Sequence, residues 1–217
     1  MSDLTLVIGN KNYSSWSLRP WLAMRVANIP FREVRIPLYD PATAGELASW
    51  SPSGKVPLLL DGGLKVWDSL AICEYLAEQY PDRHLWPEER EARAVARSVS
   101  AEMHSGFANL RQAMSMNIRR RYPGQGRTQD CLHDIQRVLQ IWGDCRSRFG
   151  IGGDFLFGRF SIADAMFAPV VLRFQTYEYE LDGVAQDYAA AILALPAMQE
   201  WEEAAVAELE SIPKFDK

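Results

Sequence analysis

The hydrophobic pattern of the chain changes its period part-way along, and this change constrains the fold more than any other feature. Up to about residue 80, short apolar runs typical of strands alternate with segments in which apolar residues recur every three to four positions. From about residue 88 onward only the helical period remains. An α/β region followed by an all-helical region indicates two packed domains. We expect them at residues 1–82 and 88–217, with a linker at Pro81–Pro87.

The first region is predicted to follow the order βαβαββα. Strands are expected at residues 4–8, 31–36, 56–60 and 64–67, helices at 17–27 and 70–79, and a short helix or loop at 40–50. The sequence Asp61-Gly62-Gly63 between two apolar runs is a strong hairpin signal. Because proline is tolerated in the first helical turn, Pro20 places the beginning of its helix near residues 15–18.

The second region is predicted to consist of long amphipathic helices. They are expected at residues 89–121, 130–149, 162–177 and 186–209, with breaks at 123–124, 150–153, 182–183 and Pro196. The basic run Arg119–Arg121 is interpreted as the last turn of the first of these helices, where cations favour the helix dipole. Ser161 and Asp164 have the spacing of a capping box at the beginning of the third.

The overall composition excludes several classes of function. The net charge of −5 and the pI of about 5.3 argue against nucleic acid or an anionic membrane as a partner. No run approaches the roughly 20 apolar residues of a membrane span. The acidic beginning Met1–Asp3 does not resemble a secretory leader, so a cytoplasmic location is expected. The three cysteines form no C-x-x-C pair, so we expect neither a metal site nor a dithiol motif, only small core residues.

The segment Tyr13–Pro20 lies at a predicted strand-to-helix turn and carries chemistry. Such a turn directs backbone N–H groups and a partial positive charge toward an anion. A hydroxyl there, such as that of Ser14, can donate a hydrogen bond to a thiolate and so lower the pKa of a thiol. Taken alone, the serine pair Ser14-Ser15 is more simply explained as a helix cap.

Two further segments can bind a small peptide-like ligand. A cis bond between Val56 and Pro57 would expose the backbone N–H and C=O of Val56, although a trans entry into the strand is the more frequent alternative. Asp68 and Ser69 stand before a predicted helix, where a carboxylate and a hydroxyl act either as a double cap or as a site for an amino group and a carboxylate.

Together these segments resemble the glutathione transferase family over essentially the whole chain. The shared marks are Ser14-Ser15-x-Ser17-x-Arg19, Val56-Pro57, Asp68-Ser69-Leu70-Ala71-Ile72-x-Glu74-Tyr75-Leu76 and Phe160-Ser161-Ile162-Ala163-Asp164, in family order and spacing. The chain is most similar to serine-type, zeta-like bacterial members, although Trp16 stands where zeta members carry a cysteine. The resemblance implies a thioredoxin-like N-terminal domain, a C-terminal helical bundle, a homodimer, and glutathione as co-substrate with no metal.

The resemblance also implies roles for individual residues. Ser14 would activate the thiol of glutathione, and Tyr13, Ser15 and Ser17 remain alternatives. The residues implied to bind glutathione are Ser14, Lys55, Val56, Pro57, Asp68 and Ser69. Val56 would hold the cysteinyl backbone, Asp68 the ammonium group and Ser69 the γ-glutamyl carboxylate. Lys55 would reach the glycyl carboxylate, unless it is simply a solvated lysine.

The pocket for an electrophile is expected between the domains. Met103, His104, Phe107 and Arg111 recur at helical spacing and are expected to present one face there, together with Tyr13 and Trp16. A surface position is the alternative for His104. Zeta isomerases bind an acidic substrate through an arginine whose position falls near Thr176 here, and Arg173 lies one turn earlier.

The predicted function is the conjugation of glutathione to a small electrophile, as in detoxification. One alternative is a glutathione-dependent cis–trans isomerase of the maleylacetoacetate isomerase kind, which uses the same glutathione site. Another is a non-catalytic binding protein of the same fold. A glutaredoxin-like reductase is disfavoured because residues 13–17 contain no cysteine.

Overall fold

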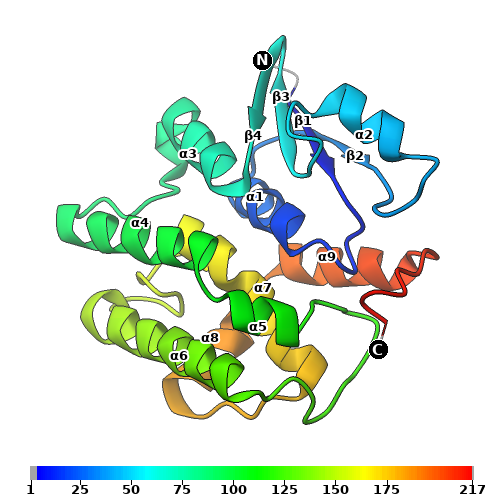
Figure 1. The fold of residues 1–217 in the computed structure, drawn as a ribbon. Coiled ribbons are helices and arrows are strands. Elements are labelled where there is room, and N and C mark those ends of the chain that lie inside the picture. The colour runs from blue at the N-terminus through cyan, green and yellow to red at the C-terminus, as the bar shows by residue number, and fades with distance from the viewer. Residues whose placement is uncertain (1–3, 217) are drawn as a thin grey trace.

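The computed structural model describes residues 4–216, so the outermost ends of both expected domains lie outside the described residues (Figure 1). Its strands are β1 Leu4–Ile8, β2 Arg32–Arg35, β3 Leu58–Asp61 and β4 Leu64–Trp67. Its α-helices are α1 Ser15–Val26, α2 Ala44–Trp50, α3 Ser69–Gln79, α4 Arg90–Ser105, α5 Ala108–Ala113, α6 Gln129–Phe149, α7 Ile162–Tyr177, α8 Gly183–Leu193 and α9 Pro196–Ala207. The order βαβαββα expected for the first region is confirmed.

The strands form one mixed sheet in the order β2-β1-β3-β4. β1 pairs parallel with β2 and antiparallel with β3, and β3 and β4 form the expected hairpin around Gly62, whose φ is +56°. Side chains alternate along β1: Leu6 and Ile8 pack in the cluster that contains α1 and α3, whereas Val7 packs in the cluster beside α2. Helices therefore cover both faces of the sheet, which is the thioredoxin-like arrangement.

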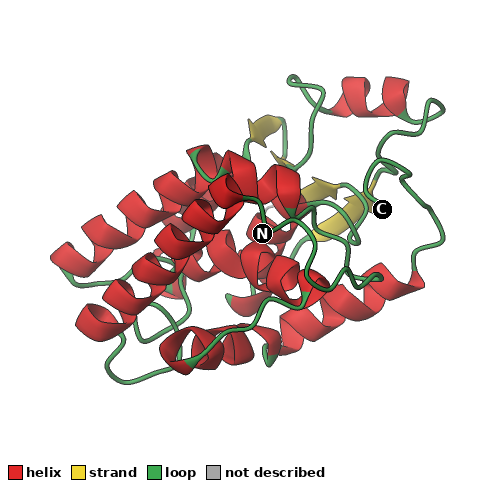
Figure 2. Ribbon diagram, turned by 60° about the horizontal axis from the view of Figure 1, so that its bottom comes forward, coloured by secondary structure: helices red, strands yellow, loops and turns green. Residues whose placement is uncertain are grey.

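The helices α4 to α9 make up the second part of the fold, and in Figure 2 the strands lie at the edge of the helical mass. Its centre is α7, which is buried along nearly its whole length and packs against α4, α8 and, in the N-terminal domain, α1. Trp142 of α6 is fully buried and lies edge-on to Phe174 of α7 and Tyr188 of α8. The helical C-terminal domain thus has an aromatic core, and α7 connects it to the sheet domain.

The capping box at the beginning of α7 is confirmed. The carboxylate of Asp164 accepts hydrogen bonds from the N–H of Ser161 at 2.8 Å and of Leu156 at 3.0 Å. Burial raises the pKa of Asp164 to about 6, and these hydrogen bonds oppose the rise. This side chain therefore fixes both the entry to the central helix and the loop before it.

The prediction of one helix over residues 89–121 is wrong, because the structure has two shorter helices, α4 and α5, in this range. α4 ends at Ser105, because Gly106 takes an extended conformation and Phe107 a left-handed one with φ of +56°. α5 is short, and Arg119–Arg121 lies in a turn rather than in the last turn of a helix. The N–H of Arg119 instead donates to the Asn12 side chain, so this segment is held by the loop that follows β1.

Two smaller expectations have different outcomes. α1 begins at Ser15, within the range of 15–18 expected from Pro20, although Pro20 is the sixth residue of the helix and lies beyond its first turn. Cys73, Cys131 and Cys145 are buried in the core, as expected. Within residues 4–216, no helix is long and apolar enough to cross a membrane. The same residues contain no group of three or more histidine, cysteine or acidic side chains placed to hold a metal ion.

Replacing Asp164 by alanine tests the anchor of α7. The substitution leaves the N–H groups of Leu156 and Ser161 buried without their acceptor, so we expect the free energy of unfolding to fall by about 3 kcal/mol. Urea denaturation followed by far-ultraviolet circular dichroism measures the change. Asp154→Ala, in the exposed part of the same loop, is the matched control and should cost less than about 0.5 kcal/mol. Equal losses in both variants would contradict this role for Asp164.

Candidate active site

Ser14 lies at the junction between the first strand and its helix. The chain leaves β1, turns through residues 10–13, and enters α1 with Ser14 as the N-cap. The N–H of Ser17 donates to the Ser14 Oγ at 3.3 Å, and the two hydroxyl groups share a hydrogen bond of 2.7 Å. The N–H of Gly9 donates to the Ser17 Oγ at 3.1 Å. Ser14 is therefore a helix cap, as its local sequence indicates.

The partners of the two hydroxyl groups suggest the direction of the hydrogen bond between them. The Ser17 Oγ already accepts from Gly9 and is fully buried, so its own proton is best used toward the Ser14 Oγ. The Ser14 Oγ then accepts two hydrogen bonds, and its proton is left to point into the neighbouring cleft. The same arrangement thus both caps α1 and offers a donor.

Two adjoining clefts open beside Ser14. The larger has a volume of about 480 Å³ and the smaller of about 380 Å³, and Trp16, Lys55 and Val56 line both. The larger is also lined by Tyr13, Ser14, Ser15, Leu38, Tyr39, Leu47, Gly54, Arg111, Ser115, Met116, Arg173 and Phe215. The smaller is completed by Ser53, Pro57, Trp67, Asp68 and Ser69. All the residues implied to bind glutathione therefore line one or both clefts.

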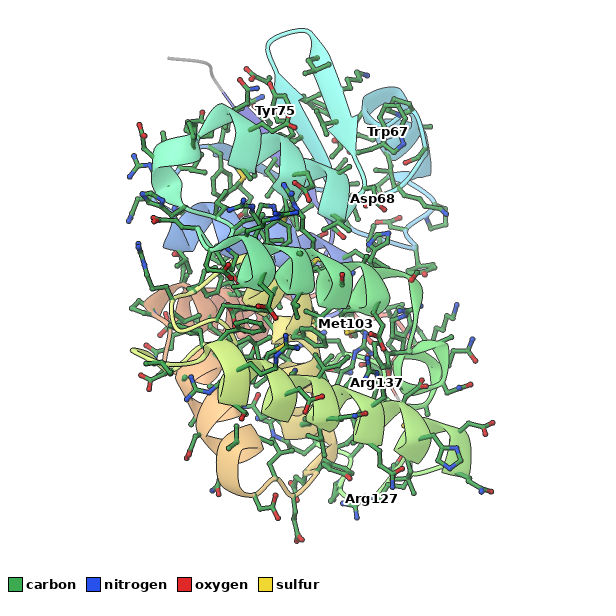
Figure 3. The ribbon with its side chains drawn as sticks, turned by 90° about the vertical axis from the view of Figure 1, so that its left-hand side faces the viewer. Trp67, Asp68, Tyr75, Met103, Arg127 and Arg137 are labelled. Atoms are coloured by element: carbon green, nitrogen blue, oxygen red, sulfur yellow. The ribbon has the colours of Figure 1, made fainter. Side chains whose placement is uncertain are left out.

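The smaller cleft has polar groups that face a ligand position. The bond between Val56 and Pro57 is cis, as the family resemblance implies. The Ser69 side chain is 1% exposed, and its hydroxyl has no hydrogen-bond partner among the described residues. Asp68 stands where β4 leads into α3, above Met103 of α4 (Figure 3). One carboxylate oxygen of Asp68 caps α3 through the N–H groups of Leu70 and Ala71.

His104 connects the two domains at this cleft. Its Nε2 lies 3.2 Å from the other carboxylate oxygen of Asp68, and its ring lies edge-on to Trp16 at 5.3 Å. It is half-buried, not a surface histidine, and burial lowers its pKa while Asp68 opposes the decrease and Arg19 and Arg111 add to it. The neutral imidazole therefore donates from Nε2 to Asp68 at neutral pH.

Two arginines lie over the ring of Trp16, and a third lines the larger cleft with it. The guanidinium of Arg19 lies 4.3 Å from the ring centre, and that of Arg111 lies 5.6 Å from it. Arg173 of α7 lines the larger cleft and donates to the Ser15 Oγ at 3.1 Å. Burial lowers the pKa of Arg19 to about 9 and of Arg173 to about 10, and repulsion from neighbouring arginines contributes to both. The wall of the larger cleft is therefore positively charged.

The phenol of Tyr13 is fully used by protein groups. It accepts from the Arg119 guanidinium at 3.0 Å and from the N–H of Ile212 at 3.2 Å. It donates to the carboxylate of Asp216 at 3.0 Å. A phenol has one proton and two lone pairs, so the hydroxyl has no further capacity for a ligand, although the ring of Tyr13 lines the larger cleft.

Some of the residues expected to line the electrophile pocket lie on the larger cleft, and others lie in the core. Tyr13, Trp16 and Arg111 line the larger cleft, and His104 contacts Trp16. Phe107, which was expected in the pocket, is 7% exposed and packs in the core, because the break after α4 turns it away from the face shared by the helical spacing. Met103 packs in the same core.

Four residues line the larger cleft that were not predicted there from the sequence: Tyr39, Ser115, Met116 and Phe215. They come from loops and from the C-terminal segment, where no hydrophobic period indicates which way a side chain points. Arg173 was noted as a candidate, and the structure places it on the cleft. Thr176, one turn later, is buried and bonds the carbonyl of Asn117, so it holds a loop.

Comparison with known proteins agrees with this geometry. A model described as the glutathione S-transferase N-terminal domain matches residues 13–79, and one described as the C-terminal domain matches residues 125–204. A probable maleylacetoacetate isomerase of Vibrio cholerae is 30% identical over 153 residues, which cover 68% of this chain and 70% of that protein. The chain belongs to the glutathione S-transferase family.

Other relatives support the same family. A probable maleylacetoacetate isomerase of Caenorhabditis elegans is 26% identical over 185 residues, which cover 83% of this glutathione transferase and 84% of that protein. A Burkholderia glutathione transferase homolog with bound glutathione superposes with a TM-score of 0.71 at 22% identity, covering 94% of this chain and 98% of that one. A diazinon-metabolizing glutathione S-transferase of Bombyx mori gives 0.73 at 18% identity, covering 95% and 99%. These structures confirm the fold.

Titration of His104 tests the electrostatics of the interdomain contact. We expect its pKa to lie below the ordinary value of about 6.5, and Asp68→Asn to lower it further, because the substitution removes the nearby carboxylate that favours the imidazolium. NMR of the imidazole protons across pH measures both values. A His104 titration that is unchanged in Asp68→Asn would contradict the contact.

Proposed function

We propose that this glutathione transferase binds glutathione in the smaller cleft, with its thiol reaching into the adjoining larger cleft, where the hydroxyl of Ser14 stabilises the thiolate. The observation that carries the proposal is the hydrogen-bond chain from Gly9 through Ser17 to Ser14 on the wall of the larger cleft. With Ser17 as the donor between the two hydroxyl groups, the proton of Ser14 is available to a ligand there. The N-terminus of α1 adds its partial positive charge at the same point. The glutathione bound to the Burkholderia structure supports the choice of ligand.

The chemistry of the smaller cleft fits the γ-glutamyl and cysteinyl parts of glutathione. The Ser69 hydroxyl, buried and unpaired within the described part of the chain, would donate to the γ-glutamyl carboxylate. Asp68 would pair with the ammonium group through the oxygen that faces His104. The backbone of Val56, before the cis bond, would pair with the cysteinyl backbone. Lys55 is exposed at the rim of both clefts, where it would meet the glycyl carboxylate.

The energies are of the size that thiolate formation needs. Lowering the thiol pKa by about two units requires about 2.7 kcal/mol of preferential thiolate stabilisation. A hydrogen bond to a charged group contributes about 1.5–3 kcal/mol, and the helix N-terminus about 0.3–1 kcal/mol. The neighbouring arginines Arg111 and Arg173 act in the same direction. One hydroxyl at this helix end is therefore sufficient for the proposed activation.

The alternative hydroxyl groups are less suitable. Tyr13 has no free proton or lone pair, because Asp216, Arg119 and Ile212 use all three positions. The Ser17 hydroxyl is fully buried behind Ser14. These contacts support Ser14 over Tyr13 and Ser17. The Ser15 hydroxyl accepts from Arg173 and also lines the larger cleft, so Ser15 stays an alternative that Ser15→Ala tests.

The proposed overall reaction is attack of the thiolate on a small electrophile held in the larger cleft, with proximity as the second contribution to rate. Family membership favours an enzyme over the non-catalytic alternative. The three cysteines are buried as small core residues, which fits a reducing compartment and supports a cytoplasmic location. We also propose the homodimer that the resemblance implies, which sedimentation would test.

A second candidate function is glutathione-dependent isomerisation. In that reaction the thiolate adds to a carbon–carbon double bond, the resulting single bond rotates, and the thiolate leaves as the double bond re-forms. Arg111 and Arg173 on the larger cleft favour this candidate, because two cations suit an acidic substrate. The maleylacetoacetate isomerases of Vibrio cholerae and Caenorhabditis elegans among the relatives support it further.

Substitution of single hydroxyl groups tests the activating residue. We expect Ser14→Ala to lower kcat/KM for conjugation about 100-fold, because a hydrogen bond to the developing charge is lost. Tyr13→Phe should retain the activity toward a small substrate within a fewfold. Steady-state kinetics with a small aryl halide measures both. If Tyr13→Phe abolishes activity and Ser14→Ala retains it, the assignment of Ser14 is wrong.

Substitution of Arg111 separates the two candidate reactions. Arg111→Gln should raise KM for a maleyl-type dicarboxylic substrate about tenfold, since it removes a cation that faces the cleft. KM for glutathione and for a neutral aryl halide should change less than about twofold. Arg120→Gln, an exposed arginine away from the cleft, is the control. No turnover of the dicarboxylic substrate by the unaltered protein, or equal effects on charged and neutral electrophiles, would contradict the isomerase candidate.

A further inference from the structure

The chain after α9 returns to the active site. Figure 1 shows this C-terminal segment, residues 208–216, turning back toward the sheet domain and the loop that follows β1. Glu208 is largely buried, and its carboxylate accepts from the N–H groups of Lys11 at 2.6 Å and of Asn12 at 3.0 Å. The segment is thus bound directly to the turn that leads into Ser14.

The far end of the C-terminal segment has its own anchor. The carboxylate of Asp216 accepts from the Tyr13 phenol at 3.0 Å and from the Asn117 side chain at 2.7 Å. The N–H of Ile212 donates to the same phenol, and Ile212 is 4% exposed. Arg119 donates to the phenol and to the carbonyls of Glu208 and Glu210. The phenol of Tyr13 is therefore the centre of a network that joins three separate parts of the chain.

These anchors place an aromatic side chain on the larger cleft. Phe215 lines the cleft, with its ring centre 5.8 Å from that of Tyr13 and 5.7 Å from that of Tyr39. The ammonium group of Lys214 lies 5.7 Å from each of the Phe215 and Tyr39 ring centres. Leu38, Leu47 and Met116 add apolar surface to the lining of this cleft. Arg111 and Arg173 line the same cleft and give it positive charge.

We propose that the C-terminal segment is a specificity element of the second-substrate pocket, with Phe215 as its contact and Tyr13 as the positioning residue that holds it through Asp216. The inference rests on the proposed function, because it takes the larger cleft as the place of the second substrate. The cleft then selects an electrophile with an aromatic or aliphatic body, which packs against Phe215, and an anionic group directed to the arginines. Tyr13 then affects which second substrate binds, and it does not activate the sulfur of glutathione.

Binding of two ligands that differ only at the sulfur tests this inference. S-Hexylglutathione places an apolar chain in the second-substrate pocket, whereas glutathione does not. We expect Phe215→Ala and Tyr13→Phe each to weaken binding of S-hexylglutathione about five- to tenfold and to change binding of glutathione less than twofold, measured by isothermal titration calorimetry. Leu209→Ala is the matched control, because Leu209 belongs to the same segment but is 95% exposed. It should change neither affinity.

Hydrogen exchange provides a ligand-free readout of the anchor. In Tyr13→Phe the N–H of Ile212 loses its acceptor, so peptides from residues 208–216 should exchange faster while those from α7 do not. Unchanged exchange, or equal weakening of both ligands in Phe215→Ala, would overturn the inference. If the unaltered protein binds neither ligand, the proposed function is wrong, and the assignment of Phe215 to substrate choice is wrong with it. The hydrogen-exchange result is independent of ligand binding and decides whether Tyr13 anchors the C-terminal segment.

Discussion

The packing of α1 against α7 is the contact on which the rest of the structure depends. α1 presents Ser14 and Ser15 at its N-terminus, and α7, the buried centre of the helical domain, presents Arg173 beside them at 3.1 Å from the Ser15 Oγ. Neither domain contains the complete site. Asp164, buried at the beginning of α7, therefore influences the cleft from a distance, because it fixes the entry of the helix that carries Arg173.

The charge around Trp16 is unusual for the interior of a protein. Arg19 is 1% exposed, and two of its guanidinium nitrogens lack a hydrogen-bond partner among the residues described. Burial, Arg173 and Arg111 lower the pKa of Arg19, and Cys73 and Asp68 offset them in part. Uncompensated cations at a buried site are costly, so an anionic ligand in the adjoining clefts would relieve part of that cost. A thiolate at Ser14 and a carboxylate near the arginines both meet this requirement.

Sequence patterns predicted the parts of the fold that repeat with a period. The element order of the first region, the hairpin at Gly62 and the capping box at Asp164 follow from local rules, and the structure confirms them. The length of the helix after residue 89 does not follow, because the helical period alone does not reveal that the backbone leaves helical geometry at Gly106 and Phe107. The position of Phe215 on the cleft was not predicted either, since it depends on contacts between distant parts of the chain. Ser14, Val56 and Asp68, which family motifs implied to bind glutathione, line the two clefts.

The central claim is that this site converts the thiol of bound glutathione to a thiolate. The ultraviolet absorbance of the thiolate, recorded across pH with the protein saturated by glutathione, measures the pKa of the bound thiol directly. The account predicts a pKa about two units below the free-thiol value of about 8.5, with the chromophore present at neutral pH. A bound thiol that titrates at the free value, under conditions where calorimetry shows the site to be filled, would contradict it.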